Sequence, residues 1–163
     1  MLKQWVAAVV LALVGVTAGA IVQGRAYHLE AAAADFIADV VDPYLIVQAA
    51  LANDDLAPVG AAARSIQQAA GALGSDGKPL AAAAAKAAQA RTLEAARVAF
   101  GDLSHALIAY ADRTKQPIEG RIVAFCPMAD KSWVQVEGTI ANPYYGKSMA
   151  TCGRATRKLS ATK

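Results

Sequence analysis

The residues of this chain that could do chemistry lie near its C-terminus, between positions 125 and 153. Both cysteines fall here, each close to a methionine. Met128 follows Cys126 by two positions, and Met149 precedes Cys152 by three. Residues two apart in an extended chain, or three apart on a helical turn, can share a face. If the chain between the pairs folds back, two thiolates and two thioethers converge, a soft donor set that selects Cu(I) or Ag(I) over harder ions.

The same two cysteines also fit a structural disulfide. A bond between Cys126 and Cys152 would close a loop of about 26 residues and stabilise a small exported domain by about 3–4 kcal/mol, if its effect is mainly on chain entropy. Met128 and Met149 would then fill space beside Trp133. A thiol-redox enzyme is a third hypothesis, opposed by the lack of a Cys-x-x-Cys pair. Spacing alone leaves the soft-metal site and the disulfide open.

Aromatic and turn-forming residues surround the sulfur-bearing positions. The run Asn142 to Gly146 reads Asn-Pro-Tyr-Tyr-Gly and predicts a rigid turn. Its tyrosine rings would cover the sulfur cluster or present an interface to a partner. We predict site-shielding or interface roles for Phe125, Trp133, Asn142, Pro143, Tyr144 and Tyr145.

The other polar residues have structural interpretations, and we predict no catalytic residue and no enzymatic activity. Ser104 has no base and orienting acid evident in the sequence, so a nucleophilic role lacks support. Asp54 and Asp55 follow an apolar helical pattern and indicate a cap for the next helix. His28 and His105 are predicted to be solvent-exposed.

The first 20 residues have the features of an export signal. Lys3 supplies a positive start, residues 5–16 form an apolar stretch, and Ala18-Gly19-Ala20 is a small-x-small cleavage site. The alternative is an uncleaved anchor to about Val22, close to the shortest span of a bilayer. Both place the domain outside the cytoplasm, in the periplasm or tethered to the inner membrane. In such a compartment a close cysteine pair can be oxidised.

Alanine-rich helices are predicted between the signal and the sulfur-bearing segment. Apolar residues recur alternately every three and four positions, which is typical of one helical face. A loop is predicted at residues 74–77, with Pro79 opening the next helix. The pattern predicts a mainly α fold, a small antiparallel bundle of three to four helices. The predicted helices span residues 29–53 with a kink at Pro43, then 56–73, 80–90 and 93–112.

From Arg113 the pattern changes to short extended pieces at 122–125 and 133–136, followed by turns and a helical turn at Met149–Cys152. This C-terminal loop and short-strand segment should pack on the bundle. We predict one domain over residues 29–155 and a basic tail over 156–163. The formal net charge is +3 without a run of basic residues, which argues against a nucleic-acid partner. Membrane contact is expected only through an N-terminal anchor.

The C-terminal segment resembles a bacterial family of exported domains of unknown function. The resemblance covers residues 36–155, and related domains occur appended to periplasmic adaptor subunits of heavy-metal efflux pumps. The upstream matches are Tyr44 to Asp55 with its Asp-Asp-Leu end, and Ala96-Arg97-x-Ala-Phe100 followed by Leu103-Ser104. The most specific matches are Phe125-Cys-Pro-Met-Ala, a tryptophan a few residues later, Asn142-Pro-Tyr-Tyr-Gly and Met149-x-x-Cys152-Gly.

This resemblance implies a periplasmic helical module tied to copper or silver handling. The leading hypothesis is therefore a non-catalytic protein that binds a soft metal ion, foremost Cu(I), with Cys126, Met128, Met149 and Cys152 as ligands. An efflux-pump or other envelope protein would be its partner. The alternative is an interaction module of the envelope that a Cys126–Cys152 disulfide stabilises, without metal.

Overall fold

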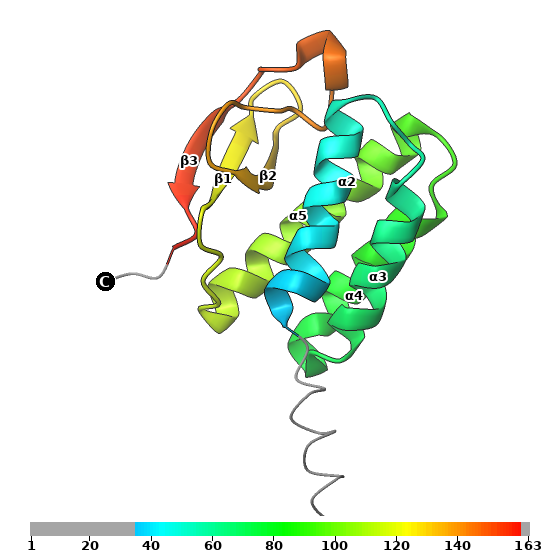
Figure 1. The fold of residues 1–163 in the computed structure, drawn as a ribbon, viewed down its shortest axis with the longest axis vertical. Helices are drawn as coiled ribbons and strands as arrows, with labels where there is room; N and C mark the ends of the chain where they lie inside the picture. Colours follow the sequence, from blue (N-terminus) through cyan, green and yellow to red (C-terminus); the bar gives the residue numbers. More distant parts are fainter. Residues whose placement is uncertain (1–34, 161–163) are drawn as a thin grey trace, which may run out of the picture. The chain divides into compact units, whose positions relative to one another are not determined.

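The structure, a computed structural model, describes residues 35–160. Here the chain is mainly helical and carries a small three-stranded antiparallel sheet (Figure 1). The predicted signal or anchor and His28 lie outside these residues. No helix within residues 35–160 is long and apolar enough to span a membrane. The elements are the π-helical turn η1 (Ile37–Val41), α2 (Asp42–Ala52), α3 (Val59–Gly71), α4 (Gly74–Gln89), α5 (Leu93–Thr114), β1 (Arg121–Cys126), β2 (Lys131–Val136), the 3-10 turn η2 (Gly146–Met149) and β3 (Arg154–Lys158).

The first helix continues across Pro43, as its apolar spacing predicts. The π-helical turn η1 leads directly into α2, and Pro43 lies in the first turn of α2. The wider π-helical turn before it gives the proline ring room that a regular α-helix would not. The predicted stripe forms the core face, because four of its members are fully buried: Val40, Tyr44, Val47 and Leu51.

The prediction of a loop at residues 74–77 is wrong. Helix α4 already begins at Gly74 and contains Pro79 in its interior. Gly77 is buried against α3, and a Cβ there would collide with the carbonyl oxygen of Ala70 and lie 2.7 Å from Cβ of Leu73. The glycine thus permits close packing of α3 and α4, which outweighs its low helix propensity.

Helix α5 is the element that joins the helices to the sheet. Thr92 caps its N-terminus, because the Thr92 side chain accepts a hydrogen bond from the Ala95 N–H at 3.1 Å. Lys115 caps its C-terminus and adopts a left-handed φ of 58°. Its buried face carries the predicted residues Ala96, Phe100, Leu103, Leu107 and Tyr110.

Strand β1 is the centre of the sheet, paired antiparallel with β2 on one side and β3 on the other (Figure 1). The extended pieces predicted at 122–125 and 133–136 lie within β1 and β2. The predicted start of a basic tail at residue 156 is wrong, because β3 continues to Lys158 and Leu159 packs into the core. All five residues of β3 are exposed, so backbone pairing defines this strand and no apolar pattern marks it.

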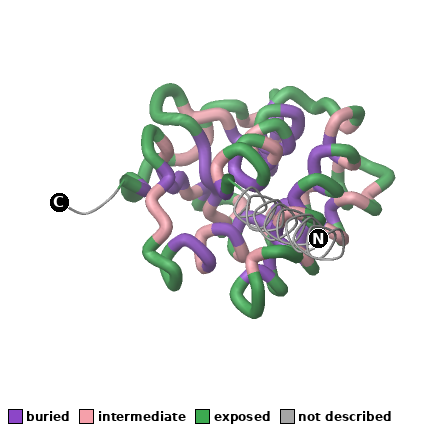
Figure 2. The backbone as a smooth tube through the Cα atoms, turned by 60° about the horizontal axis from the view of Figure 1, so that its bottom comes forward, coloured by how far each residue is buried: buried purple, intermediate pink, exposed green. Residues whose placement is uncertain are grey.

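A row of four aromatic rings connects the helices to the sheet. Tyr44 stacks on Phe100 with ring centroids 5.1 Å apart, and Phe100 lies 5.9 Å from Tyr144. Tyr144 meets Trp133 edge-on at 5.8 Å. Along the backbone, buried stretches are interspersed with exposed ones (Figure 2). The loop that carries Tyr144 is therefore part of the core.

Candidate functional site

The two cysteines meet at one end of the β1–β3 pair. Cys126 is the last residue of β1, and Cys152 lies just before β3 begins at Arg154. Phe125 pairs with Arg154 in the antiparallel register, so the two thiols follow directly beyond this pair. Their Sγ atoms are 3.4 Å apart, and both thiols are free. The fold thus brings together two residues that are 26 positions apart in sequence.

The two thiols differ in acidity. Burial acts to raise the pKa of Cys126, but hydrogen bonds to its sulfur outweigh burial and lower its pKa below the usual value. The hydrogen bond to Cys126 raises the pKa of Cys152, and burial and the charge of Cys126 act in the same direction. When the pair loses its first proton, Cys126 is therefore the thiol that ionises, and its thiolate accepts a hydrogen bond from the Cys152 thiol. The groups that lower the pKa of Cys126 are the backbone N–H of Ala129, the Cys152 thiol, the Asn142 amide and the backbone N–H of Met128.

The two methionines lie beside the thiols in the chain. The Met128 backbone N–H acts to lower the pKa of both thiols, and the Met149 carbonyl accepts a hydrogen bond from the Cys152 N–H at 3.0 Å. That bond closes the turn predicted between Met149 and Cys152, although the regular 3-10 turn already ends at Met149. The Met128 side chain is 63% exposed, and Met149 is half-buried.

The predicted shielding residues divide into core residues and residues near the surface. Tyr144 is buried, its hydroxyl donates to the Ser132 carbonyl at 2.6 Å, and burial raises its pKa, so it stays neutral. Trp133 is fully buried, and its indole N–H donates to Gln135 at 3.0 Å. A Cβ at Gly153 would lie 2.7 Å from the Trp133 ring, so the chain that follows Cys152 crosses this indole closely.

Phe125 and Tyr145 lie nearer the surface, and both are half-buried. The guanidinium of Arg154 lies over the Phe125 ring, 5.4 Å from its centroid. The Tyr145 hydroxyl donates to the Met128 carbonyl at 3.2 Å. This bond ties the Asn-Pro-Tyr-Tyr-Gly loop to the turn that follows Cys126.

Asn142 is fully buried and contacts both thiol-bearing segments. Its side-chain N–H groups donate to Cys126 Sγ at 3.3 Å and to the Cys152 carbonyl at 2.8 Å. Its side-chain oxygen accepts from the backbone N–H of Tyr144 at 2.8 Å and of Tyr145 at 3.3 Å. The side chain therefore lies between the two cysteines and the aromatic loop.

Helix residues that sequence reasoning did not select as site residues hold this loop in place. Arg97 of α5 donates to the carbonyls of Pro143 at 3.1 Å and Leu51 at 3.2 Å, and it forms an ion pair with Asp54. The other carboxylate oxygen of Asp54 accepts the Lys147 N–H at 3.2 Å. The hydrogen bond from Arg97 lowers the pKa of Asp54. We call Arg97 and Asp54 the loop clamp.

The prediction that Asp54 caps the next helix is therefore wrong. The residue adopts a left-handed φ of 59°, which turns its carboxylate toward Arg97. Asp55 instead accepts the Ala57 N–H at 2.8 Å, and neither aspartate caps α3 with its side chain. In the sequence, the family resemblance at Asp54-Asp55-Leu56 and at Ala96-Arg97-x-Ala-Phe100 was the signal that could have identified the two residues of the loop clamp. Gln48 of α2 adds a hydrogen bond to the Ala141 carbonyl at 2.7 Å.

The donor set at the thiol pair is soft. Within residues 35–160, no group of three or more His, Cys, Asp or Glu side chains is placed to hold a metal ion. His105 is exposed on α5, as predicted. A harder ion such as zinc would need such a group. An ion at this site would depend on the thiols and the neighbouring methionines, a composition suited to Cu(I) or Ag(I).

The geometry opposes nucleophilic thiol chemistry at the surface. A reactive cysteine combines a lowered pKa with access to solvent. Here Cys126, with the lowered pKa, is fully buried, whereas the partly exposed Cys152 has the raised pKa. A thiol-redox enzyme is thus less consistent with the site than a ligand pair or a disulfide.

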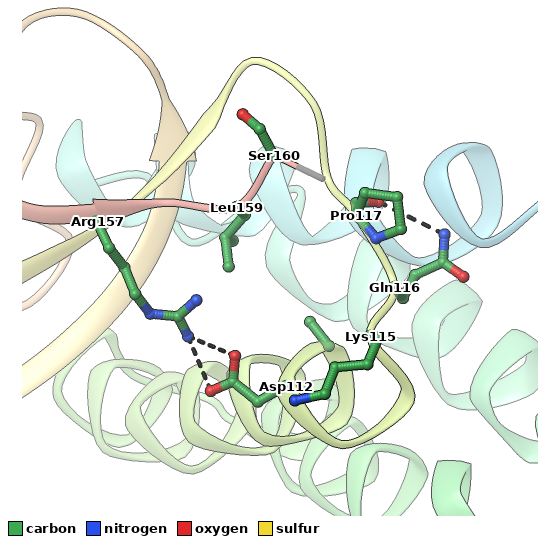
Figure 3. A pocket seen from close by; sticks show the side chains of 8 residues that line it. Asp112, Lys115, Gln116, Pro117, Arg157, Leu159 and Ser160 are labelled. Atoms are coloured by element: carbon green, nitrogen blue, oxygen red, sulfur yellow. Dashed lines mark hydrogen bonds and ion pairs between the residues drawn. The ribbon is translucent and has the colours of Figure 1, made fainter. Parts of the chain in front are cut away.

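A second, polar hollow lies at the far end of α5 and differs in chemistry (Figure 3). It encloses about 180 Å³ and is lined by Lys115 and Ser160 among others. Arg157 donates to both carboxylate oxygens of Asp112, at 2.7 and 2.8 Å. Because these two charges offset each other, Lys115 is the remaining charged residue in the lining of the hollow.

Comparison with known proteins identifies no relative of this chain. No family model matches it, and no curated protein or solved structure is significantly similar to it. The assignment of a function therefore rests on the site itself and on the motif residues.

Proposed function

We propose that this protein is a non-catalytic, exported module that binds one soft metal ion, foremost Cu(I), at the Cys126–Cys152 pair. Both cysteines would bind as thiolates, with Met128 and Met149 as thioether ligands. The four helices would act as an antiparallel bundle that supports this segment. The motif resemblance favours a role in copper or silver handling in the periplasm, free or tethered to the inner membrane, with an efflux-pump or envelope protein as partner.

The observation that carries the proposal is the contact between the two thiols inside a network that favours a thiolate. Metal ions bind the thiolate rather than the thiol. The Asn142 amide donates a hydrogen bond to the buried Cys126 sulfur at 3.3 Å, and the backbone N–H groups of Ala129 and Met128 also act to lower the pKa of this thiol, which favours its ionised form. The two Sγ atoms are 3.4 Å apart. This distance is longer than a disulfide bond, which is about 2.05 Å. It is shorter than the about 4.6 Å that two metal–thiolate bonds of about 2.3 Å could span.

The test is an anaerobic Cu(I) titration of the reduced protein against a chromophoric competing chelator. We expect one equivalent to bind, with affinity that falls as the pH is lowered, because protons compete for both thiolates. Cys126→Ser and Cys152→Ser should each weaken binding at least about a hundredfold, more than the loss of a second-shell contact. Met128→Leu and Met149→Leu should weaken it less. Unchanged affinity in both serine variants would refute the proposal.

The second candidate is an interaction module that a Cys126–Cys152 disulfide stabilises. Two observations favour it: the thiols already touch, and a shallow hollow of about 300 Å³ lies beside the motif loop. Val98 lines this hollow and is 59% exposed. Thiol labelling of the protein taken directly from the cell envelope separates the candidates. Two blocked thiols that reductant releases would favour the disulfide, whereas two free thiols would favour the metal site.

A further inference from the structure

We infer that Asn142 is a positioning residue that holds the two thiols in their reduced contact and so sets the balance between dithiol and disulfide. It contacts one thiol-bearing segment through the Cys126 sulfur and the other through the Cys152 carbonyl. This inference does not depend on metal binding and applies to both functions considered above.

The orientation of the Asn142 amide is fixed by its neighbours. Its oxygen accepts two backbone N–H groups, those of Tyr144 and Tyr145. A flipped amide would place its NH₂ group against these two donors, which is unfavourable. The NH₂ group must therefore face Cys126 Sγ and the Cys152 carbonyl, both of which are acceptors. All four hydrogen-bonding positions of this buried side chain are occupied.

The backbone of Asn142 strengthens the same connection. Its N–H donates to the Ala150 carbonyl at 2.8 Å, and its carbonyl accepts the Gly146 N–H at 3.1 Å. The first bond holds the chain that leads into Cys152, and the second closes the aromatic loop. A single residue therefore links the end of β1, the loop and the segment before β3.

Only one of these bonds changes when the thiols are oxidised. A disulfide sulfur bears less negative charge than a thiol or thiolate sulfur and is a weaker acceptor, so the bond from Asn142 to Cys126 stabilises the reduced pair selectively. The bonds to the Cys152 carbonyl and to the loop are present in both states. Removing the amide donor should therefore favour the disulfide. Of the other groups around Cys126, the Cys152 Sγ lies 3.4 Å away, and Lys131 of β2 is the partner of Cys126 in the strand register.

The test uses oxidation by glutathione disulfide at one fixed pH. The S–S bond of glutathione disulfide breaks and the Cys126–Cys152 bond forms, while both thiol protons and the two electrons pass to two glutathione molecules. Protein is equilibrated at graded ratios of glutathione to its disulfide, and the remaining thiols are alkylated and counted by mass spectrometry. This measures the equilibrium constant for oxidation without using metal binding.

Asn142→Asp keeps the oxygen that accepts the loop N–H groups and replaces the N–H donor to sulfur by a carboxylate oxygen. Asn142→Ser adds no charge, and its hydroxyl ends one atom short of the amide nitrogen that reaches Cys126 Sγ at 3.3 Å. We expect both to raise the oxidation constant about three- to tenfold, the range of one net hydrogen bond. The matched control is Asn53→Asp, the same change at an exposed helix end, which should leave the constant unchanged. Folding of each variant is checked by denaturant unfolding. An unchanged or lowered constant in a folded Asn142 variant would overturn the inference. If neither variant folds, NMR of the wild-type protein decides: the Asn142 side-chain amide protons should exchange with solvent faster in the oxidised than in the reduced protein, because their bond to Cys126 Sγ weakens, and equal exchange rates would overturn the inference.

Discussion

Tyr44 connects the helices to the sheet through a single hydroxyl group. The hydroxyl accepts the Val134 N–H at 3.0 Å and shares a hydrogen bond of 2.7 Å with Ser104 Oγ. Burial raises the pKa of Tyr44, so it remains protonated. Ser104 was considered above as a nucleophile without a base, and the structure gives it a hydrogen-bonding role in the core.

Removing this hydroxyl should destabilise the fold. In a Tyr44→Phe variant the Val134 N–H and Ser104 lose a buried partner, and we expect the free energy of unfolding to fall by about 1–3 kcal/mol. The control is Tyr110→Phe, because the Tyr110 hydroxyl has no hydrogen-bond partner among residues 35–160, and its effect should be small. Urea unfolding compares the two. Equal effects would show that the Tyr44 hydroxyl contributes nothing specific.

At the scale of elements, the Asn-Pro-Tyr-Tyr-Gly loop is held by α2 and α5 as well as by the sheet. The loop clamp requires a glycine at position 146. Gly146 adopts a left-handed φ of 57°, and a Cβ there would collide with the Asp54 carboxylate and the Arg97 guanidinium. The clamp and the loop therefore fit together only without a side chain at this position.

Gly146→Ala should thus destabilise the protein more than a comparable change elsewhere. Gly120 is the matched control, because its φ of 70° is also left-handed but no atom lies within 4 Å of its Cβ position. Both variants carry the left-handed penalty of about 1–2 kcal/mol. We expect Gly146→Ala to cost at least about 1 kcal/mol more and to increase the alkylation rate of the buried Cys126 thiol. Identical losses in unfolding free energy would contradict the clamp.

The periodicity of apolar residues was sufficient to predict that the helices exist, but it did not predict how helices and strands pack against one another. The stripes that include Tyr44 and Phe100 lie buried where the spacing placed them. The start of α4 was missed because Gly74 and Gly77 indicate a loop locally, whereas packing against α3 decides the conformation. Strand β3 was missed for the opposite reason, since its exposed residues carry no pattern and its pairing partner is distant in sequence.

The candidate site was predictable in its sulfur residues and not in their support. Cysteine and methionine can be recognised as sulfur ligands from residue type alone, so Cys126 and Cys152 could be selected as site residues directly from the sequence. The roles of Asn142 and Arg97 depend on hydrogen bonds to backbone groups 10 and 46 positions away. Such contacts leave no local pattern, because a carbonyl acceptor belongs to every residue type.

At the scale of the whole molecule, the oxidation state of the thiol pair decides whether a disulfide cross-links the C-terminal segment. If the thiols are oxidised, the disulfide closes a loop of about 26 residues and should raise the free energy of unfolding by about 3–4 kcal/mol. Urea unfolding of oxidised and reduced protein measures this difference. The Cys152→Ser variant should show no response to oxidant. No stabilisation in the wild type would mean that the bond strains the end of the β1–β3 pair.

The central claim is that the two thiols together bind a soft ion. X-ray absorption at the copper edge of the anaerobic one-to-one complex tests this most directly, because it reports which elements lie next to the metal. The account predicts a first shell of sulfur, with at least two sulfur ligands, which is lost in the Cys126→Ser, Cys152→Ser double variant. A first shell of nitrogen or oxygen, or a sulfur shell that persists in the double variant, would contradict it.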